Sequence, residues 1–275
     1  MQSYFHQPNI DPVLLHLWGP FQIRWYSILF IGGFLVGRAI LLQLAKKKRF
    51  HFTANHIEQL IVWLLVGCVV GARVFYCFVY DPKQFLQNPF FLFEIYNGGL
   101  SFHGGLVGAG IAAYFFARKH KIPFWNLTDA MALSTPIGLA MGRLGNFING
   151  ELWGRVTDVP WAVVFRSGGP EPRHPSQLYE FGLEGVVLFS VLWWSQRYLK
   201  RDGLITILFL FGYTTARFIV EFFRQPDAHL GFLFLGLSMG QWLSVVMFAA
   251  SIGFGIVTLR NPSEAKPKKK NKKLK

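Results

Sequence analysis

The chain has 275 residues, of which 52% are hydrophobic, 17% are aromatic and only 15% are charged. A water-soluble domain carries about 25% charged residues, so this composition excludes an ordinary soluble protein and indicates an integral membrane protein. The formal net charge of +14 does not indicate a nucleic-acid partner, because most of the basic residues follow long apolar segments, where they set membrane topology.

Seven apolar segments are predicted to form transmembrane helices. In chain order they cover residues 22–45, 57–80, 100–118, 125–148, 177–194, 204–223 and 237–259. Basic clusters follow the first, third, fifth and seventh segments, at residues 46–49, 118–121, 197–201 and 260–275. Since cytoplasmic loops are enriched in lysine and arginine, the N-terminus is expected outside and the C-terminus in the cytoplasm. The predicted fold class is an all-α integral membrane protein with about seven transmembrane helices.

Two loops between these segments are predicted to lie outside. The longer, residues 149–175, is expected to form a small extracytoplasmic cap with a short hairpin around residues 161–165. A phenylalanine-rich loop at residues 89–93 is expected to lie in the membrane interface. The predicted domains are a polytopic catalytic domain over residues 1–260 and a basic cytoplasmic tail over residues 261–275, which is expected to contact anionic lipid headgroups.

Ten basic residues lie outside the four clusters, and nine of them are arginine. Topology requires only positive charge, so the choice of arginine suggests bidentate recognition of phosphate or carboxylate groups. The alternative is that each arginine neutralises a buried acid, such as Glu58, Asp129, Glu180, Glu184 or Glu221. The ten residues are Arg24, Arg38, Arg73, Lys83, Arg143, Arg155, Arg166, Arg173, Arg217 and Arg224. No role is assigned to Arg38 and Arg73.

The sixth apolar segment carries a polar stripe of four residues. Tyr213, Arg217, Glu221 and Arg224 follow one another at i, i+4, i+8 and i+11, which places them within about 80° of arc on a helix. Such a stripe must face protein or water rather than lipid. Glu221 can neutralise Arg217, and the second arginine then leaves positive charge for an anion. An internally paired packing ladder is the alternative.

The fourth segment ends in a polar stretch. Arg143 and Asn146 share one helix face, and Arg143 lies about 27 Å along the helix from Trp125, close to the outer interface. Continuation of the helix beyond Asn146 is doubtful, because Asn149-Gly150 is typical of a turn. The glycines of this stretch permit close approach either of a neighbouring helix or of a ligand.

His103 lies near the outer start of the third segment, next to glycines 104, 105 and 108. A lone histidine near an interface is more often structural than catalytic, and the glycines fit helix packing at least as well as phosphate binding. No spacing of metal ligands is found, and the cysteines Cys68 and Cys77 indicate neither a disulfide nor a metal site. Neither a metal nor a cofactor is therefore expected.

Several of these motifs resemble those of bacterial phosphatidylglycerol–prolipoprotein diacylglyceryl transferases. The segment from Gly142 to Gly154, which reads GRLGNFINGELWG, is similar to the family signature. The sequence HGG at 103–105, the stripe from Tyr213 to Arg224 and the sequence RQPD at 224–227 are similar to further family motifs. The resemblance extends over nearly the whole chain, from about Tyr26 to Gln241.

The resemblance implies transfer of the diacylglyceryl group of phosphatidylglycerol to the lipobox cysteine thiol of a preprolipoprotein, with release of glycerol phosphate. The site would face the outer leaflet of the bacterial cytoplasmic (inner) membrane. We hypothesise that Arg143 and Arg217 hold the phosphate and that His103 is the base. The expected substrate-binding residues are Tyr26, Asn146, Glu151, Gly154, Tyr213, Glu221 and Arg224. The expected partners are phosphatidylglycerol, the lipobox peptide and membrane lipids.

Two other classes of protein compete with this interpretation. A transporter for lipids or anionic solutes could use the same arginines, but it predicts polar residues toward the cytoplasmic side, and these become rare below Tyr213. A membrane scaffold would use polar residues only to join helices, and it predicts balanced pairs of acids and bases. The arginines of the key segments instead outnumber the nearby acids.

Overall fold

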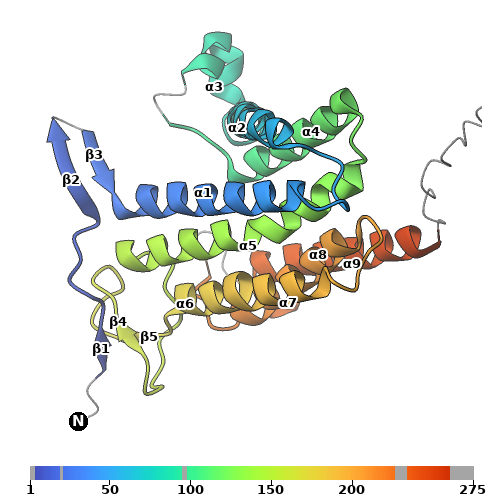
Figure 1. The fold of residues 1–275 in the computed structure, drawn as a ribbon. Coiled ribbons are helices and arrows are strands. Elements are labelled where there is room, and N and C mark those ends of the chain that lie inside the picture. Colours follow the sequence, from blue (N-terminus) through green and yellow to red (C-terminus); the bar gives the residue numbers. More distant parts are fainter. Residues whose placement is uncertain (1–3, 19–20, 95–97, 227–233, 261–275) are drawn as a thin grey trace, which may run out of the picture. The chain divides into compact units, whose positions relative to one another are not determined.

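The computed structural model describes residues 4–18, 21–94, 98–226 and 234–260, without the side chains of Phe21, Phe102 and His103. The fold is mainly helical (Figure 1). The long helices are α1 (Trp25–Ala45), α2 (Ala54–Phe75), α4 (Phe102–His120), α5 (Phe124–Asn149), α8 (Leu204–Val220) and α9 (Met239–Arg260). The π-helical turn η1 (Tyr76–Tyr80) extends α2, and a second, η4 (Phe181–Val187), joins α6 (Ser176–Glu180) to α7 (Leu188–Ser195). Helix thus occupies every predicted apolar segment, with ends within three residues.

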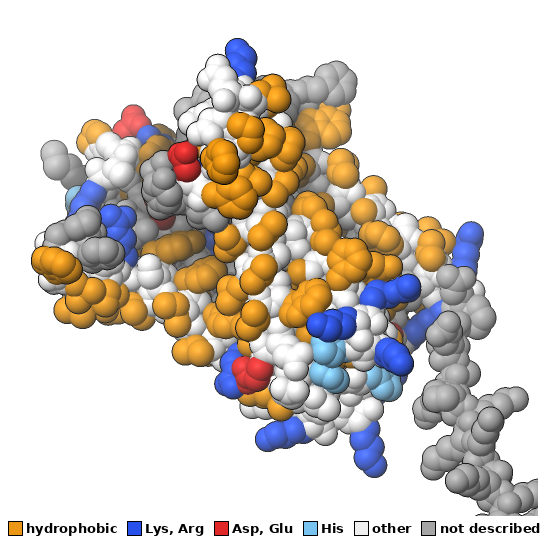
Figure 2. Space-filling model, turned by 90° about the horizontal axis from the view of Figure 1, so that it is seen from above, with side chains coloured by type: hydrophobic (Ala, Val, Ile, Leu, Met, Phe, Trp, Pro, Cys, Tyr) orange, Lys and Arg blue, Asp and Glu red, His pale blue; other side chains and the backbone are white. Residues whose placement is uncertain are grey.

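Within the described residues, three helices are long and apolar enough to cross a bilayer: Trp25–Ala45, Ala54–Tyr80 and Met239–Arg260. The α8 helix is apolar but shorter. Large apolar side chains are exposed along α2 and α9, and Figure 2 shows apolar side chains over much of the visible surface. Water-exposed apolar patches of this extent are unusual for a soluble protein, so the exposed faces suit a lipid environment. The number of seven crossings stays a prediction.

The chain forms two compact units. Unit 1 consists of Met1–Ala39 with Met131–Lys275, and unit 2 of Ile40–Ala130. Helices α1 and α5 each run from one unit into the other. The basic tail, residues 261–275, lies outside the described residues, so its expected contact with lipid headgroups stays a prediction.

Unit 2 is built on close packing of α2 against α4. A Cβ atom on Gly71 would lie 2.7 Å from the Cα atom of Gly108, and one on Gly67 would lie 2.7 Å from the Gly108 carbonyl oxygen. A Cβ atom on Gly104 would likewise collide with Phe75 and Gly71. These glycines therefore serve helix packing, as small residues commonly do between membrane helices, and this answers the question that the sequence left open.

The chain of unit 2 leaves the second long helix at the predicted end of that segment, residue 80. Asp81 follows η1, and its side chain accepts a hydrogen bond from the backbone N–H of Gln84 at 3.2 Å, which caps the short helix α3 (Pro82–Gln87). Asn88 caps the 3₁₀ turn η2 (Pro89–Phe93) in the same way. The placement of the phenylalanine-rich loop in the membrane interface stays a prediction.

Unit 1 begins with two small β elements (Figure 1). The strand β1 (Phe5–His6) joins β4 (Val163–Val164) and β5 (Pro172–Arg173) in a three-stranded sheet, and β2 (Val13–Trp18) pairs with β3 (Phe21–Arg24) as a hairpin. Residues 149–175 thus contain an antiparallel pair of strands, but it joins 163–164 to 172–173 and is not a short hairpin around 161–165. The extracytoplasmic location of this segment stays a prediction. The hairpin that precedes α1 was not predicted. It replaces the first three residues of the predicted first span, because residues 22–24 belong to β3.

The cap sheet is tied to the end of α5 through one side chain. The Gln7 amide nitrogen donates to the carbonyl oxygens of Phe147 at 3.3 Å and Ile148 at 3.1 Å. Helix α5 continues to Asn149, one residue beyond the predicted segment, so the doubt about its continuation past Asn146 is resolved in favour of helix. The turn comes at Gly150, whose φ of +70° is accessible to glycine at little cost.

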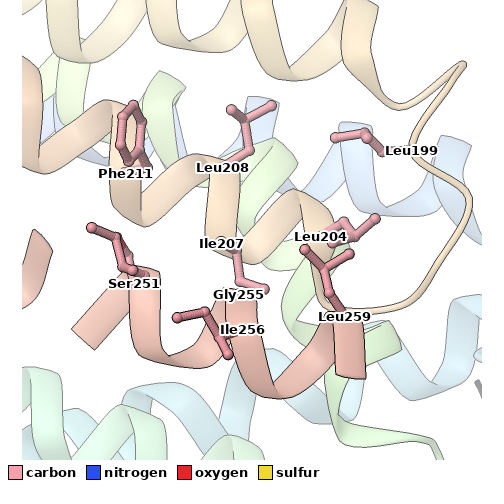
Figure 3. Close-up of a pocket in the computed structure, with 10 residues that line it drawn as sticks. Leu199, Leu204, Ile207, Leu208, Phe211, Ser251, Gly255, Ile256 and Leu259 are labelled. Carbon is pink, nitrogen blue, oxygen red and sulfur yellow. The ribbon is translucent and has the colours of Figure 1, made fainter. Parts of the chain in front are cut away.

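The α8 and α9 helices of unit 1 lie side by side and enclose an apolar groove of about 310 Å³ (Figure 3). Leu204, Ile207 and Phe211 line it from α8, and Ile252, Gly255 and Leu259 from α9. Because this groove has an apolar lining, it suits hydrocarbon and not a charged headgroup. The polar residues of α8 lie further along the same helix.

Candidate functional site

Three arginines from two helices and the following turn surround one buried carboxylate in unit 1. The carboxylate belongs to Glu180, at the end of α6, and its side chain is 0% exposed. Its oxygens lie 2.9 Å from Nε of Arg143 and 3.5 Å from Nη1 of Arg224, and it also accepts a hydrogen bond from Nη1 of Arg217. Because one carboxylate serves three guanidinium groups, Glu180 is the centre of the site.

Close backbone packing brings Glu180 and Glu184 to Arg143. A Cβ atom on Gly185 would lie 2.6 Å from the Cβ atom of Ala140 on α5, so only glycine allows this approach. Glu184 is 0% exposed, and its Oε2 lies 3.6 Å from Nη2 of Arg143. Glu184 belongs to the π-helical turn η4, a form of helix that occurs frequently at functional sites.

Helix α8 ends at Val220, so the prediction that all four stripe residues lie on one helix is wrong: Tyr213 and Arg217 lie on α8, and Glu221 and Arg224 lie in the turn that follows it. Through Glu221 the site also reaches the start of α9. The Glu221 carboxylate forms an ion pair with Nη2 of Arg217 at 2.9 Å and accepts a hydrogen bond from the Ser238 hydroxyl at 2.8 Å. Ser238 also caps α9, since its hydroxyl oxygen accepts from the backbone N–H of Gln241, whose side chain accepts from the N–H of Ser238. A Cβ atom on Gly240 would lie within 2.9 Å of the Glu221 carboxylate. Helix α9 is therefore positioned directly by the site.

Charge in this cluster is balanced. Arg143, Arg217 and Arg224 face Glu180, Glu184 and Glu221, so the surplus of arginine expected from the sequence is not found among these groups. The arginine side chains are nevertheless 12–18% exposed, whereas those of Glu180 and Glu184 are fully buried. The acids thus contact the guanidinium groups from the buried side, while part of each arginine side chain stays exposed.

The end of α5 is held by Glu151. Its carboxylate accepts hydrogen bonds from the side-chain amides of Asn146 at 2.9 Å and Asn149 at 3.0 Å. The backbone carbonyl of Glu151 accepts from the side chain of Gln177 at 2.7 Å. Asn146 and Glu151 therefore form one hydrogen-bonded unit, as expected for residues that share a site, and Gln177 joins that unit to α6.

Gly154 fixes the position of Arg224. A β-bridge pairs these two residues, and the N–H of Arg155 donates to the carbonyl of Phe223 at 2.8 Å. The Arg155 side chain donates to the carbonyl of Arg224 at 2.9 Å. A Cβ atom on Gly154 would lie 2.5 Å from the Phe223 carbonyl oxygen. A larger residue at position 154 would thus displace Arg224, and the expected part of Gly154 in substrate binding stays a prediction.

Two tyrosines of the predicted set also lie in unit 1. Tyr26, the second residue of α1, packs so closely on α5 that a Cβ atom on Gly145 would lie 2.7 Å from its ring. Tyr213 lies one turn before Arg217 on α8, stacks on Phe209 and interacts electrostatically with Glu184 and Arg217. Tyr26 thus lies against the helix that carries Arg143, and Tyr213 lies next to the arginine cluster.

His103 is the one predicted site residue outside unit 1. It is the second residue of α4 in unit 2, and its side chain lies outside the described residues. Its role as base therefore stays a prediction. Asp227 of the RQPD sequence also lies outside the described residues.

Sequence reasoning underestimated the acids of α6 and η4. Glu180 and Glu184 were considered only as partners that neutralise arginine, although Glu180 contacts all three arginines of the site. The signal that could have found them is their occurrence as the only two acids of a strongly apolar helical segment, four residues apart. Ser238 was missed because an isolated serine carries no distinctive pattern.

His174 forms a small network in the cap. Its Nδ1 atom lies 3.0 Å from the hydroxyl of Tyr179, which accepts a hydrogen bond from Nε1 of Trp161 at 2.7 Å. Burial, and secondarily the charge of Arg155, lower the pKa of His174. The neutral imidazole is thus favoured. The backbone of His174 also contacts the site, since its carbonyl oxygen accepts a hydrogen bond from the N–H of Gly154 at 2.9 Å.

Among the described residues, no group of three or more His, Cys, Asp and Glu side chains could hold a metal ion. What the arrangement offers is a set of partly exposed guanidinium groups with fixed orientation. Such groups bind phosphate by paired, charge-assisted hydrogen bonds and stabilise negative charge that develops on a leaving phosphate.

Comparison with known proteins gives one consistent result. The profile of the family described as prolipoprotein diacylglyceryl transferase matches residues 12–257. Proteins named phosphatidylglycerol–prolipoprotein diacylglyceryl transferase are 49% identical in Idiomarina loihiensis, over 91% of this chain and 94% of the relative, and 48% identical in Bordetella bronchiseptica, over 93% and 98%. A relative of the same name from Aliivibrio fischeri is 49% identical over 90% of this chain and 88% of its own length.

Proposed function

The chain belongs to the prolipoprotein diacylglyceryl transferase family, and we propose that it transfers the diacylglyceryl group of phosphatidylglycerol to the lipobox cysteine of a prolipoprotein. The observation in the structure that supports this most is the set of partly exposed arginines 143, 217 and 224 around the buried Glu180. The reaction is a step of lipoprotein maturation, and the enzyme is a transferase of the membrane.

The reaction forms one bond and breaks one. The thiolate sulfur of the lipobox cysteine attacks the glyceryl carbon that carries the phosphate ester, and a thioether forms. The bond between that carbon and the phosphate oxygen breaks, and its electron pair leaves with glycerol phosphate. The thiol proton passes to a base, which is needed because a thiol of pKa about 8.5 is mostly protonated at neutral pH.

In this proposal, Arg143 and Arg217 bind the phosphate and stabilise the charge that grows on the leaving oxygen. They suit this task because Glu180, Glu184 and Glu221 hold them from the buried side, so little reorganisation is needed during the reaction. Tyr213, Asn146 and Arg224 add hydrogen bonds, and Glu151 and Gly154 keep Asn146 and Arg224 in place. Tyr26 contacts lipid at the entrance. His103 is the base.

The proposed topology follows the positive-inside pattern of the sequence. The protein is a multi-pass protein of the bacterial inner membrane, with about seven spans, the N-terminus outside and the C-terminus in the cytoplasm. Residues 1–260 form one catalytic domain whose cap, residues 149–175, faces outward. The arginine cluster then lies near the outer leaflet, where it meets both phosphatidylglycerol and the translocated peptide.

The test is a transfer assay with purified protein in detergent. Labelled diacylglyceryl is expected to pass from phosphatidylglycerol to a synthetic lipobox peptide, and not to the same peptide with serine in place of its cysteine. Arg143→Ala is expected to abolish transfer, while Arg166→Ala, at an exposed position of the cap, keeps it. Phosphatidylglycerol binding without any transfer would contradict the proposal and leave a lipid-holding or transport role.

The base is tested separately. His103→Gln is expected to lower the turnover number at neutral pH and to remove the acidic limb of the pH–rate profile, because the neutral imidazole is the form that accepts the proton. Full activity with an unchanged profile would exclude His103 as the base while leaving the transferase assignment intact.

A further inference from the structure

Arg73 of α2 is an arginine without a sequence-derived role, and it is among the most buried side chains of the protein, at 2% exposure. A buried guanidinium group is costly unless its donors are satisfied inside the protein. The identity of its partners therefore indicates what Arg73 does.

The guanidinium group of Arg73 binds one loop at both of its ends. Nε donates to the carbonyl oxygen of Leu92 at 3.1 Å, and Nη2 donates to that of Phe91. Nη1 donates to the carbonyl oxygens of Gly98 at 2.8 Å and Gly99 at 3.0 Å. Among the described residues, all of its polar partners are backbone carbonyl oxygens. The Phe91 ring also lies over the guanidinium carbon, 4.4 Å from it.

The loop is shaped to receive this side chain. Gly98 and Gly99 have φ angles of +84° and +74°, a left-handed conformation that favours glycine, and their two successive carbonyl groups point to a single Nη1 atom. A Cβ atom on Gly99 would lie 2.6 Å from that atom, whereas one on Gly98 would meet nothing within 4 Å. The Gly98-Gly99 pair thus fits against the guanidinium group.

The same contacts continue into the first turn of α4. The N–H of Ser101 donates to the carbonyl oxygen of Ala72, next to Arg73, at 3.0 Å. The Ser101 hydroxyl accepts from the N–H of Gly104 at 3.2 Å and caps the helix. His103 lies between these two residues in the chain, so the backbone that carries it is fixed against α2.

We propose that Arg73 is a positioning residue for the transfer reaction: its guanidinium group holds residues 91–92 and 98–99 and thereby sets the position of the first turn of α4, which carries His103. This rests on the proposed function, in which His103 is the base. A lysine cannot replace Arg73, because an ammonium group is a single point donor and cannot reach carbonyl groups at both ends of the loop.

The local effect is tested by hydrogen exchange in detergent, on Arg73→Lys and on a pair of glycine variants. Arg73→Lys and Gly99→Ala are expected to speed exchange of the Ser101 and Gly104 amides while leaving the middle of α2 protected. Gly98→Ala is the matched control, since it carries the same backbone strain but its methyl group enters open space. Equal exchange at these amides in all variants and in the parent protein would overturn the proposal that Arg73 holds this part of the chain.

The catalytic effect is tested by steady-state kinetics on the same proteins. Arg73→Lys and Gly99→Ala are expected to lower kcat at least about tenfold, because small displacements of a catalytic group cost that much. The KM for the lipobox peptide is expected to stay within about twofold, because the peptide-binding groups are unchanged. Loss of structure alone would instead lower the fraction of active enzyme and leave the kcat of the active molecules unchanged. Titration of active sites measures that fraction.

A double-variant cycle separates this proposal from the proposed function. If Arg73 acts through His103, Arg73→Lys has no further effect on kcat in the His103→Gln background, whereas independent roles give multiplied losses. Multiplied losses would overturn the positioning role and leave His103 as the base. Full activity of His103→Gln alone would remove the base first, and the role of Arg73 would fail with it.

Discussion

The arginines of the unit 1 site and Arg73 of unit 2 are satisfied by different kinds of partner. In unit 1, three arginines bind carboxylates and keep 12–18% of their side chains exposed. In unit 2, Arg73 binds only backbone carbonyl groups among the described residues and is 2% exposed. An arginine held by acids on one side can offer its remaining donors to a phosphate, whereas one enclosed by carbonyl groups can only hold the chain. Exposure and partner type together separate a binding arginine from an architectural one.

The largest effect is expected at the carboxylate that all three arginines of unit 1 share. Glu180→Gln keeps the shape of the side chain but leaves the guanidinium groups without their buried counter-charge. The free energy of unfolding is expected to fall by about 3–5 kcal/mol, and transfer activity at least about a hundredfold. Thermal unfolding in detergent and the transfer assay measure the two losses.

The control for this prediction is Glu171→Gln. Glu171 is 60% exposed and lies 3.6 Å from Arg173, and an exposed pair of this kind contributes about 0–1 kcal/mol. A Glu180 variant as stable and active as the Glu171 variant would show that the acids are not what holds the arginines.

A smaller effect is expected when charge is kept and geometry is lost. Arg143→Lys is expected to lower kcat/KM about a hundredfold, because an ammonium group cannot form the paired, planar contact to phosphate. The melting temperature is expected to change less than in Glu180→Gln. Turnover close to that of the parent enzyme would exclude Arg143 as a phosphate ligand. Arg143 would then have an architectural role only, like Arg73 in unit 2. Arg166→Lys, at the exposed cap, serves as the control for arginine replacement.

Unit 2 should respond to packing rather than to charge. Gly108→Leu places a large side chain against Gly67 and Gly71 of α2, and over-packing of this kind costs about 1–3 kcal/mol. Gly110→Leu, on the same helix with nothing within 4 Å of its Cβ position, should be neutral or slightly stabilising, since leucine favours helix. Thermal unfolding of both variants measures the difference. Equal stability of the two would contradict the close α2–α4 contact.

The smallest effect is expected from His174 in the cap. Its folded-state pKa lies below the ordinary value of 6.5, chiefly through burial and then through Arg155, so the unfolded chain binds more protons below about pH 6.5. The resulting stability is present above that pH and is lost as the pH falls through the lower folded-state pKa. His174→Gln should therefore flatten the acidic side of a plot of melting temperature against pH. A parent protein without that acidic decline would contradict the lowered pKa.

Much of the fold could be read from the one-dimensional pattern. The apolar segments locate every long helix, because exclusion of charge over about 20 residues is a local property. The end of the second segment at residue 80 and the turn at Gly150 could be recognised, since the helix cap and the left-handed turn depend on neighbours in the chain. The hairpin of β2 and β3 was missed because β3 runs directly into α1, so that residues 22–24 were assigned to the first apolar segment. The end of α5 was predicted to within one residue, at 148 against Asn149.

The residues of the candidate site also fall into those that the sequence could predict and those that it could not. Arg143, Arg217, Glu221 and Arg224 could be found in the sequence because ionisable groups are rare in apolar segments. The central place of Glu180 could not, because it depends on the approach of Gly185 to Ala140 on another helix. The role of Arg73 could not either, since its partners are carbonyl oxygens, which every residue possesses.

The sequence by itself determined the membrane class, the places of the helices, the family and most of the residues of the arginine site. These properties depend on composition, on periodicity and on motifs that are continuous in the chain. Only the tertiary structure decided which charges neutralise one another, which glycines pack helices and which arginine holds a loop. Those outcomes depend on distances between segments far apart in the chain, and a guanidinium group can be satisfied equally by carboxylates or by carbonyl groups.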